Sequence, residues 1–420
     1  MISTNLLRWI NKQKIKQNIK VKITKISKLD KWKYDGFKLS HVSRKFFKII
    51  GIRIKTNFFK KGWDQPIIQQ KEIGILGIIK NIKENKYLLQ AKLEPGNINK
   101  LQLSPTVQAT KSNYSVVHGG KRVLFLNFFL GKQIFKSIQS EQAFRYYNKH
   151  NANIILKTNK KIKYSNQFKW FKKKEIYWLL KKKNLINMDT LSVFSSFVKK
   201  RHMDMPINSF KDIKKWLLHN DKKYFLTTKI IALSALKDWK VLKSKIFHKN
   251  NNFFSIIGLN ISSNSREVKK WFQPIIKGKK MSLAGFLMKD FQNTRHYLCR
   301  YILKPGSNKS TISCTVNTSD IRNYKKLNTL SEFQKKIIKK YFLNNKSNFI
   351  YNNILSEEGG RFYHSQINYK AICLNQKKII KKPNSYIWIS QNQMIELISK
   401  RKIDIEARLL FGIINIKETI

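Results

Sequence analysis

Acidic residues are scarce in this chain of 420 residues, where 23 Asp and Glu stand against 86 Lys and Arg and give a formal net charge of +63. Such an excess is typical of nucleic-acid-binding proteins. However, Lys outnumbers Arg several-fold and is spread along the whole chain, whereas Arg is preferred for reading base edges and gripping phosphates. Lys, Asn and Ile are enriched together, as an AT-rich genome imposes on tolerant surface positions. We therefore favour composition drift over a polyanion partner and expect no specific nucleic acid.

Cysteine and long apolar runs are also lacking. Cys299, Cys314 and Cys373 show neither a CxxC pair nor the spacing of metal ligands. This predicts a reducing, cytoplasmic compartment, buried free thiols and no zinc site. No apolar run approaches 18 residues, so no transmembrane helix is expected. The first residues lack the apolar core of a secretory signal, and their basic composition fits either a surface helix, which we prefer, or an organelle transit peptide.

Several catalytic signatures are missing as well. The chain has no Walker A motif and no GxGxxG after a predicted strand, which argues against a P-loop NTPase and a Rossmann dinucleotide-binding domain. It also lacks GxSxG and HExxH, the motifs of α/β-hydrolases and zinc proteases. Any activity must therefore depend on polar groups outside these motifs.

What the chain does contain is an internal repeat. Residues 28–54 align with residues 235–261 at a constant offset of 207. The correspondence continues along the chain, and the offset reaches 218 at Trp170 and Trp388, as loop insertions would produce. A repeat of this length indicates two tandem domains rather than a solenoid.

Each half of the chain reads as strands followed by a helix, an order that predicts the α+β class with mixed sheets and flanking helices. We place the first domain at 1–205 and the second at 206–420. The tract 197–245 reads as a helical connector, with a capping box starting at Ser209. The predicted strands are 46–54, 73–79, 86–93, 253–261, 283–288 and 296–302, and the predicted helices are 172–182 and 392–400.

Polar side chains are concentrated in residues 87–118. A strand leads into Glu94-Pro95-Gly96-Asn97, which reads as a type II turn with a positive φ at Gly96, and a second strand follows over 101–108. Alternation along the strands puts the polar side chains on one face. Such a face suits either a solvated hairpin or the wall of a polar pocket. Its side chains are Lys92, Glu94, Gln102, Ser104, Thr106 and Gln108.

Two acidic motifs recur at equivalent places of the repeat, Ser140-Glu141-Gln142 and 356–363 (SEEGGRFY). Their acids fit either helix caps or a functional site. Arg145 and Arg361 follow at equivalent positions, where each fits either a phosphate or its neighbouring Glu.

Other residues leave similar alternatives. Trp63 and Trp271 suit either stacking on a base or packing in the core. His118, in the polar stretch, is either structural or catalytic.

Taken together, these motifs resemble the NDP-hexose 2,3-dehydratase family. The matching strings span nearly the whole chain in order. They are WDQPIIQQKEIGILGII (63–79), LLQAKLEPGN (88–97), QLSPTVQATKSNY (102–114), QSEQ (139–142), NMD (187–189), REVKKWFQPII (266–276), SEEGGRFY (356–363) and EARLL (406–410).

The resemblance implies a fused pair of Nudix-like α+β motifs that assembles as a homodimer. The chain has no complete Nudix box of acidic metal ligands, so we expect no metal site, no cofactor and no pyrophosphate hydrolysis. The implied substrate is dTDP-4-keto-6-deoxy-D-glucose. The implied product is a 2-deoxy-3,4-diketo sugar nucleotide for deoxysugar biosynthesis, which a separate 3-ketoreductase then consumes.

The implied reaction is an elimination of water. A base removes the proton on carbon 3, which the ketone on carbon 4 acidifies, and the hydroxyl on carbon 2 leaves with a proton from a general acid. Lys92 is the candidate partner of the enolate. Glu94 and His118 are the candidate base and acid, and Tyr114 is the alternative proton donor.

The chain departs from the family pattern at Ala143, where a Gly is expected, at Leu191, where an Arg is expected, and at 313–315, where SCT replaces SPT. The last departure favours the first half as the main catalytic pocket, with the second half contributing either nucleotide contacts or an additional pocket. The candidate substrate-binding residues are Trp63, Gln65, Ser104, Gln108, Thr110, Ser112, Asn113, Glu141, Gln142, Arg145, Asn187, Trp271, Gln273, Glu357, Glu358, Gly359, Gly360, Arg361, Tyr363, Asn368 and Arg408.

Overall fold

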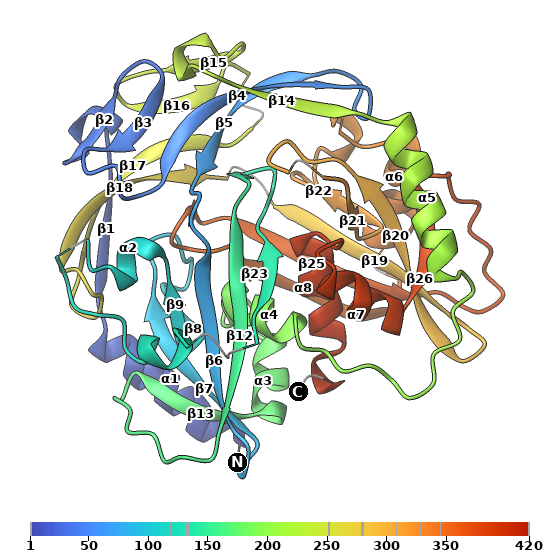
Figure 1. The fold of residues 1–420 in the computed structure, drawn as a ribbon, viewed down its shortest axis with the longest axis horizontal. Helices are drawn as coiled ribbons and strands as arrows, with labels where there is room; N and C mark the ends of the chain where they lie inside the picture. Colours follow the sequence, from blue (N-terminus) through green and yellow to red (C-terminus); the bar gives the residue numbers. More distant parts are fainter. Residues whose placement is uncertain are drawn as a thin grey trace.

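The computed structural model describes residues 2–117, 119–131, 135–250, 253–278, 281–307, 309–327, 329–344 and 346–418. The first repeat begins with a helix and a strand, continues through two sheets and ends in two helices (Figure 1). Its elements are α1 Ile2–Lys16, β1 Ile19–Thr24, β2 Trp32–Tyr34, β3 Lys38–His41, β4 Lys48–Thr56, β5 Trp63–Gln69, β6 Gly74–Asn81, β7 Lys86–Leu93, β8 Leu101–Ser104, β9 Val107–Ala109, α2 Lys111–Tyr114, β10 Ser137–Ser140, β11 Tyr146–Tyr147, β12 His150–Thr158, β13 Phe168–Lys172, α3 Lys173–Leu180 and α4 Met188–Ser195.

The second repeat has the same succession of strands, between an opening helix and two closing helices. Its elements are α5 Phe210–Lys223, β14 Leu226–Ile231, β15 Trp239–Val241, β16 Lys245–His248, β17 Ser255–Ser263, β18 Lys270–Lys277, β19 Ser282–Phe291, β20 Thr294–Ile302, β21 Thr311–Ser313, β22 Val316–Thr318, α6 Glu332–Ile337, β23 Phe349–Ser356, β24 Phe362–Tyr363, β25 Gln366–Cys373, β26 Tyr386–Ser390, α7 Gln391–Ser399 and α8 Ile405–Ile414.

The predicted helical connector at 197–245 is wrong in part. Only α5 is an α-helix in that tract, and its predicted capping box is confirmed: the Ser209 hydroxyl accepts from Asp212 N at 3.1 Å, and the Asp212 carboxylate accepts from Ser209 N at 2.8 Å. The following LTTKII segment forms β14, because β-branched residues favour an extended strand. The structural repeat thus extends upstream of the aligned residues 235–261 to this strand and the helix before it.

Each repeat contains a larger and a smaller sheet with matching strand orders. The order β10-β12-β6-β7-β13 in the first larger sheet corresponds to β23-β25-β19-β20-β26 in the second. Strands β6 and β12 are parallel, whereas β6 and β7 are antiparallel. The prediction of mixed sheets with the same strand order in both halves is therefore confirmed.

The two repeats exchange their first strands. β1 pairs with β17 of the second repeat, and β14 pairs with β4 of the first (Figure 1). The smaller sheets pack on a shared core that contains Trp32 and Phe47 from one repeat and Trp239 and Phe254 from the other. The halves are consequently interlocked. The domain boundary between residues 205 and 206, which was placed from the sequence, stays a prediction.

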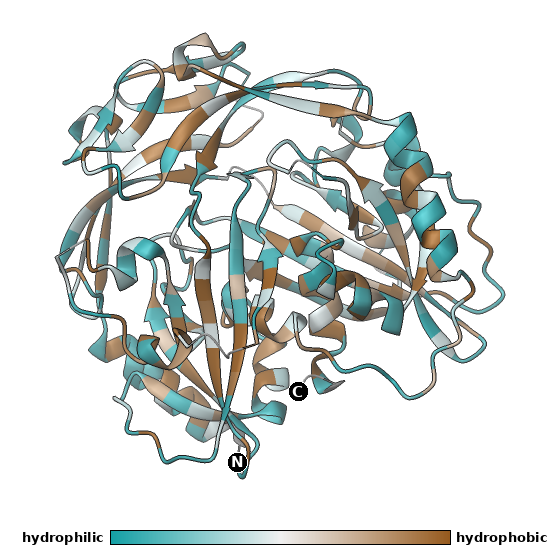
Figure 2. Ribbon diagram, in the orientation of Figure 1, coloured by the Kyte–Doolittle hydropathy of each residue, from teal (hydrophilic) through white to brown (hydrophobic). Residues whose placement is uncertain are grey.

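The larger sheets share a second core, in which α4 and α8 pack against each other. Their approach is close: a Cβ placed on Gly412 would lie 2.4 Å from Ser195 Cβ. Figure 2 shows hydrophobic residues along the inner strands, whereas α5 carries both hydrophilic and hydrophobic residues. Within the described ranges no helix is long and apolar enough to cross a membrane.

The three cysteines are free thiols, as predicted. Cys299 and Cys314 are buried, whereas Cys373 is only partly so.

The strand predicted over 101–108 is broken at Pro105. Strand β8 pairs with β7, whereas β9 pairs with β6. Between them the Thr106 hydroxyl accepts from Ile79 N at 3.0 Å and donates to Leu88 O, so it replaces main-chain ladder bonds that the crossing leaves out. The second arm of the polar hairpin therefore pairs with two neighbouring strands, first β7 and then β6.

The predicted positive φ at Gly96 is also wrong, since its φ lies outside the left-handed region. Gly96 is required instead by a close approach between the repeats. Its N–H donates to Gly359 O at 2.8 Å, and a Cβ here would lie 1.8 Å from Phe362 O. Gly306 makes the equivalent contact with Ala143 O at 2.7 Å. Each hairpin turn is therefore fastened to the acidic motif of the other repeat.

Candidate active site

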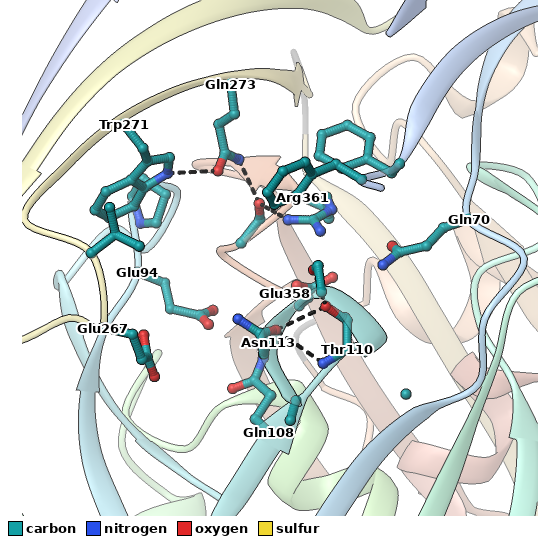
Figure 3. A pocket seen from close by; sticks show the side chains of 18 of the residues that line it. Gln70, Glu94, Gln108, Thr110, Asn113, Glu267, Trp271, Gln273, Glu358 and Arg361 are labelled. Atoms are coloured by element: carbon teal, nitrogen blue, oxygen red, sulfur yellow. Dashed lines mark hydrogen bonds between the residues drawn. The ribbon is translucent and has the colours of Figure 1, made fainter. Parts of the chain in front are cut away.

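A cavity of about 480 Å³ lies between the repeats (Figure 3). Strands β7 and β9 and the turn α2 form one wall, and the segments around 266–273 and 358–361 of the second repeat form another. Aromatic side chains of both repeats, including Trp32 and Phe272, also line it. The sequence-predicted residues that line it are Lys92, Glu94, Gln108, Thr110, Ser112, Asn113, Glu141, Trp271, Gln273, Glu358, Gly360 and Arg361.

Strand β7 places a buried amine and a buried carboxylate side by side. Lys92 Nζ lies 3.7 Å from Glu94 Oε1 and donates to Gln108 Oε1 at 2.9 Å. Arg266 NH1 lies 3.7 Å from the same Glu94 oxygen. Burial, and then the charge of Arg266, lower the pKa of Lys92. The buried ammonium of Lys92 can therefore give up its proton more readily than that of an exposed Lys.

Two further carboxyls face the cavity from the acidic motifs. Glu141 Oε1 accepts from Asn151 Nδ2 at 2.7 Å, and Glu358 Oε2 accepts from the Tyr146 hydroxyl at 2.6 Å. Burial raises the pKa of Glu141 to about 7 and also raises the pKa of Glu358. The Glu141 carboxyl can therefore hold a proton near neutral pH, which general acid catalysis requires.

A group from the second repeat presents an aromatic face and a guanidinium to the cavity (Figure 3). Trp271 Nε1 donates to Gln273 Oε1 at 2.9 Å, and Gln273 Nε2 donates to Gly360 O at 2.7 Å. Arg361 also donates to Gly360 O, at 2.9 Å, and its guanidinium lies 4.1 Å from the centre of the Phe47 ring. An aromatic face beside a fixed cation suits a nucleotide base and its phosphates.

Comparison with known proteins connects this site to a family. A family model described as NDP-hexose 2,3-dehydratase matches residues 3–197 and 210–414, which are the two repeats. The chain belongs to the NDP-hexose 2,3-dehydratase family.

Three relatives carry the same name, dTDP-4-dehydro-6-deoxy-alpha-D-glucopyranose 2,3-dehydratase. The protein from Saccharopolyspora spinosa is 30% identical over 91% of this chain and 85% of its own length. Those from Amycolatopsis orientalis and Streptomyces violaceoruber are each 28% identical, over 99% and 97% of this chain and 90% and 96% of their own lengths.

A crystal structure of ADP compounds hydrolase matches 39% of this chain and 85% of its own, with 11% identity and a TM-score of 0.22. That likeness is too slight to support an argument, and the Nudix-like assignment stays a prediction.

In this dehydratase-family chain the first repeat holds an equivalent of the Trp271 group, away from the cavity. Trp63 Nε1 donates to Gln65 Oε1 at 2.7 Å, and Gln65 donates to Phe144 O at 2.8 Å. Arg145 lies 4.2 Å from the Phe254 ring centre. Here, however, Phe59 packs edge-on against Trp63, so these side chains belong to an aromatic cluster. The sequence alone gave no means of separating the two groups.

The second repeat also carries an equivalent of the hairpin acid. Lys304 occupies the position of Glu94, and its Nζ lies 2.9 Å from Asp404 and 2.6 Å from Glu406. Burial alone would lower the pKa of Lys304, but these two carboxylates outweigh it and raise that pKa. The three charges thus satisfy one another instead of facing a ligand.

The remaining predicted residues do not line the cavity. Tyr114 packs with apolar side chains, and Asn187 caps α4 by accepting from Thr190 N at 2.9 Å. Arg408 is wholly buried and donates to Ser192 O at 3.0 Å. His118 lies outside the described residues. The others away from the lining are Ser104, Gln142, Glu357, Gly359, Tyr363 and Asn368.

Several lining residues were not among the predicted ones. They include Asp189 in the first turn of α4, Lys149, which donates to Glu72 O at 2.7 Å, Tyr146 and Arg266. Asp189 stood in the NMD string and Arg266 in the REV string, so the family resemblance held a signal for both. Within the described ranges no group of three or more His, Cys, Asp or Glu side chains is arranged to hold a metal ion.

Proposed function

We propose that this chain is a dTDP-4-keto-6-deoxy-D-glucose 2,3-dehydratase, a hydro-lyase that yields a 2-deoxy-3,4-diketo sugar nucleotide. The observation that carries the proposal is the buried Lys92–Glu94 pair facing a cavity that also contains Glu141, whose pKa burial raises to about 7. The names of the three relatives support the substrate.

The sugar would bind at the Lys92–Glu94 end of the cavity. Glu94 takes the proton from carbon 3 as the electrons of that bond form an enolate with the carbon 4 ketone. The ammonium of Lys92 stabilises the developing negative charge on the enolate oxygen, an effect that fixed donors typically make worth a few kcal/mol. Departure of the carbon 2 hydroxyl then needs a proton. Loss of water leaves the overall oxidation level unchanged, so no redox cofactor takes part.

The nucleotide would bind against the second-repeat wall of the cavity. Trp271 stacks on the thymine, and Arg361 and Lys149 face the diphosphate. This arrangement makes the first repeat the source of the proton-transfer groups and the second repeat the source of the nucleotide contacts. We further propose that the chain forms a homodimer and that a 3-ketoreductase consumes the diketo product, because the family resemblance implies both. We also propose a cytoplasmic location, which the free thiols support.

Turnover tests the proposed function directly. The chain is incubated with dTDP-4-keto-6-deoxy-D-glucose, a 3-ketoreductase and NADPH, and the loss of NADPH absorbance is followed. We expect loss that depends on the chain and on the sugar nucleotide. NADPH that persists while a relative under the same conditions consumes it would reject the proposal.

The role of Trp271 gives a prediction with a matched control. Trp271→Ala should weaken binding of thymidine diphosphate by roughly 10- to 100-fold, since stacking of a base on an aromatic ring contributes about 1–3 kcal/mol. Trp63→Ala removes the equivalent ring of the first repeat, which does not line the cavity, and should leave that affinity unchanged. Titration calorimetry measures both. Equal losses in the two variants would mean that the indole acts through the fold and not on the base.

A further inference from the structure

The buried carboxyl of Asp189 lines the cavity and has no role in the reaction steps described above. It lies in the first turn of α4 with 4% of its surface exposed. Glu141 and Glu358 each accept a short hydrogen bond from a neighbouring side chain. In contrast, no hydrogen bond or ion pair within the described part of the chain holds the Asp189 carboxyl. It is therefore free to meet a ligand.

The charges around Asp189 favour its neutral form. Burial raises the pKa of Asp189 well above its usual value, and Glu358, Glu141 and Glu94 raise it further, while Lys92 opposes them. The α4 N-terminus acts in the opposite direction, since a helix N-terminus favours an anion. Glu94, on the same cavity, has Lys92 and Arg266 each within 3.7 Å. Two carboxyls in such different surroundings are the usual basis for a division into acid and base.

We propose that Asp189 is the general acid that protonates the departing carbon 2 hydroxyl, opposite Glu94 as the base. The proposal rests on the function proposed above. After Glu94 has taken the carbon 3 proton, the enolate electrons form a double bond between carbons 2 and 3, and the carbon–oxygen bond at carbon 2 breaks. Asp189 gives its proton to that oxygen, which leaves as water. The resulting enol takes a proton on carbon 2 and loses its hydroxyl proton, so the diketone forms and the two carboxyls return to their starting states through solvent.

The second repeat offers a matched position without this role. Glu406 stands in the first turn of α8 as Asp189 does in α4, but its carboxylate is held by Lys304 at 2.6 Å. It does not line the cavity. Glu406→Gln is therefore a control for removing one buried acid from the head of a closing helix.

A substrate in which fluorine replaces the carbon 2 hydroxyl tests the proposal. Fluoride leaves as an anion and needs no proton, so it bypasses the general acid but still needs the base. Asp189→Asn should lower turnover of the natural substrate by about 10²–10⁴-fold. The same variant should release fluoride at close to the wild-type rate. Glu94→Gln should lose both activities, and Glu406→Gln should keep both. The coupled NADPH assay and a fluoride electrode measure the two.

Three results would overturn the proposal. In the first, Asp189→Asn keeps turnover of the natural substrate. In the second, Asp189→Asn loses both activities equally although its unfolding transition matches the wild type. If Asp189→Asn fails to fold, Asp189→Glu retains the carboxyl and should keep measurable turnover of the natural substrate, so the third is an Asp189→Glu variant that loses both this turnover and fluoride release. Wild-type protein that acts on neither substrate would instead reject the proposed function.

Discussion

Glu94→Gln is expected to lower turnover by about 10²-fold or more, while thymidine diphosphate still binds with nearly normal affinity. The amide has the shape of the carboxylate but accepts a proton far less readily. Glu94 lines the cavity beside Lys92, and the substitution leaves the Trp271 side chain in place to stack on the base. The variant should therefore lose catalytic turnover and keep its affinity for thymidine diphosphate.

Exchange of the carbon 3 proton with solvent distinguishes loss of the catalytic base from loss of a substrate-binding contact. In deuterated water the wild type should introduce deuterium at carbon 3 of the substrate or show a solvent-dependent elimination, whereas Glu94→Gln should do neither. Proton NMR follows the signal. Glu84→Gln removes an acid on the neighbouring turn, which is 54% exposed, and should change nothing. Full turnover in Glu94→Gln would remove Glu94 from the mechanism and return Tyr114 and His118 to consideration as proton-transfer groups.

Much of the strand pattern could be predicted because it depends on local periodicity. Strand β7 has the predicted bounds of 86–93, and α3 and α7 lie within two residues of the predicted helices. The exchange of β1 and β14 could not be predicted, because a strand's own sequence does not specify which of two similar sheets it joins. The break at Pro105 was missed for a related reason: it depends on a Thr106 hydroxyl that bonds to two other strands.

The candidate site was predicted where its residues follow one another along the chain. Lys92, Glu94 and Gln108 come from one hairpin and do line the cavity. Trp63 and Trp271 stand in nearly identical strings, yet Trp271 lines the cavity whereas Trp63 packs against Phe59. Asp189 and Lys149 were missed because their position depends on how a closing helix and an edge of the sheet meet that hairpin. Sequence gives the chemistry of each strand, whereas packing decides which of two equivalent groups faces the ligand.

Lys304→Met is expected to lower the free energy of unfolding by about 3–5 kcal/mol, because it leaves the charges of two buried carboxylates uncompensated. Lys304, Asp404 and Glu406 are 2%, 3% and 8% exposed, so water cannot replace the missing ammonium. Asp404 also caps α8 by accepting from Ala407 N at 2.9 Å, which ties the charge group to the closing helix. Urea denaturation measures the loss. Turnover of the folded variant should stay near normal, because none of the three residues lines the cavity.

Two companion variants decide whether the uncompensated charge is the cause. Lys335→Met breaks an ion pair with Glu332, which is 73% exposed, and should cost far less stability because water screens that pair. Adding Glu406→Gln to Lys304→Met removes one of the stranded charges and should recover part of the lost stability. If the double variant is no more stable than Lys304→Met alone, the stranded carboxylate charge of Glu406 is not the cause, and the lost contact of Lys304 Nζ with the Phe144 ring, 5.6 Å from its centre, becomes the explanation. Recovery would show that the ion group at the second hairpin holds the repeat together without serving the reaction.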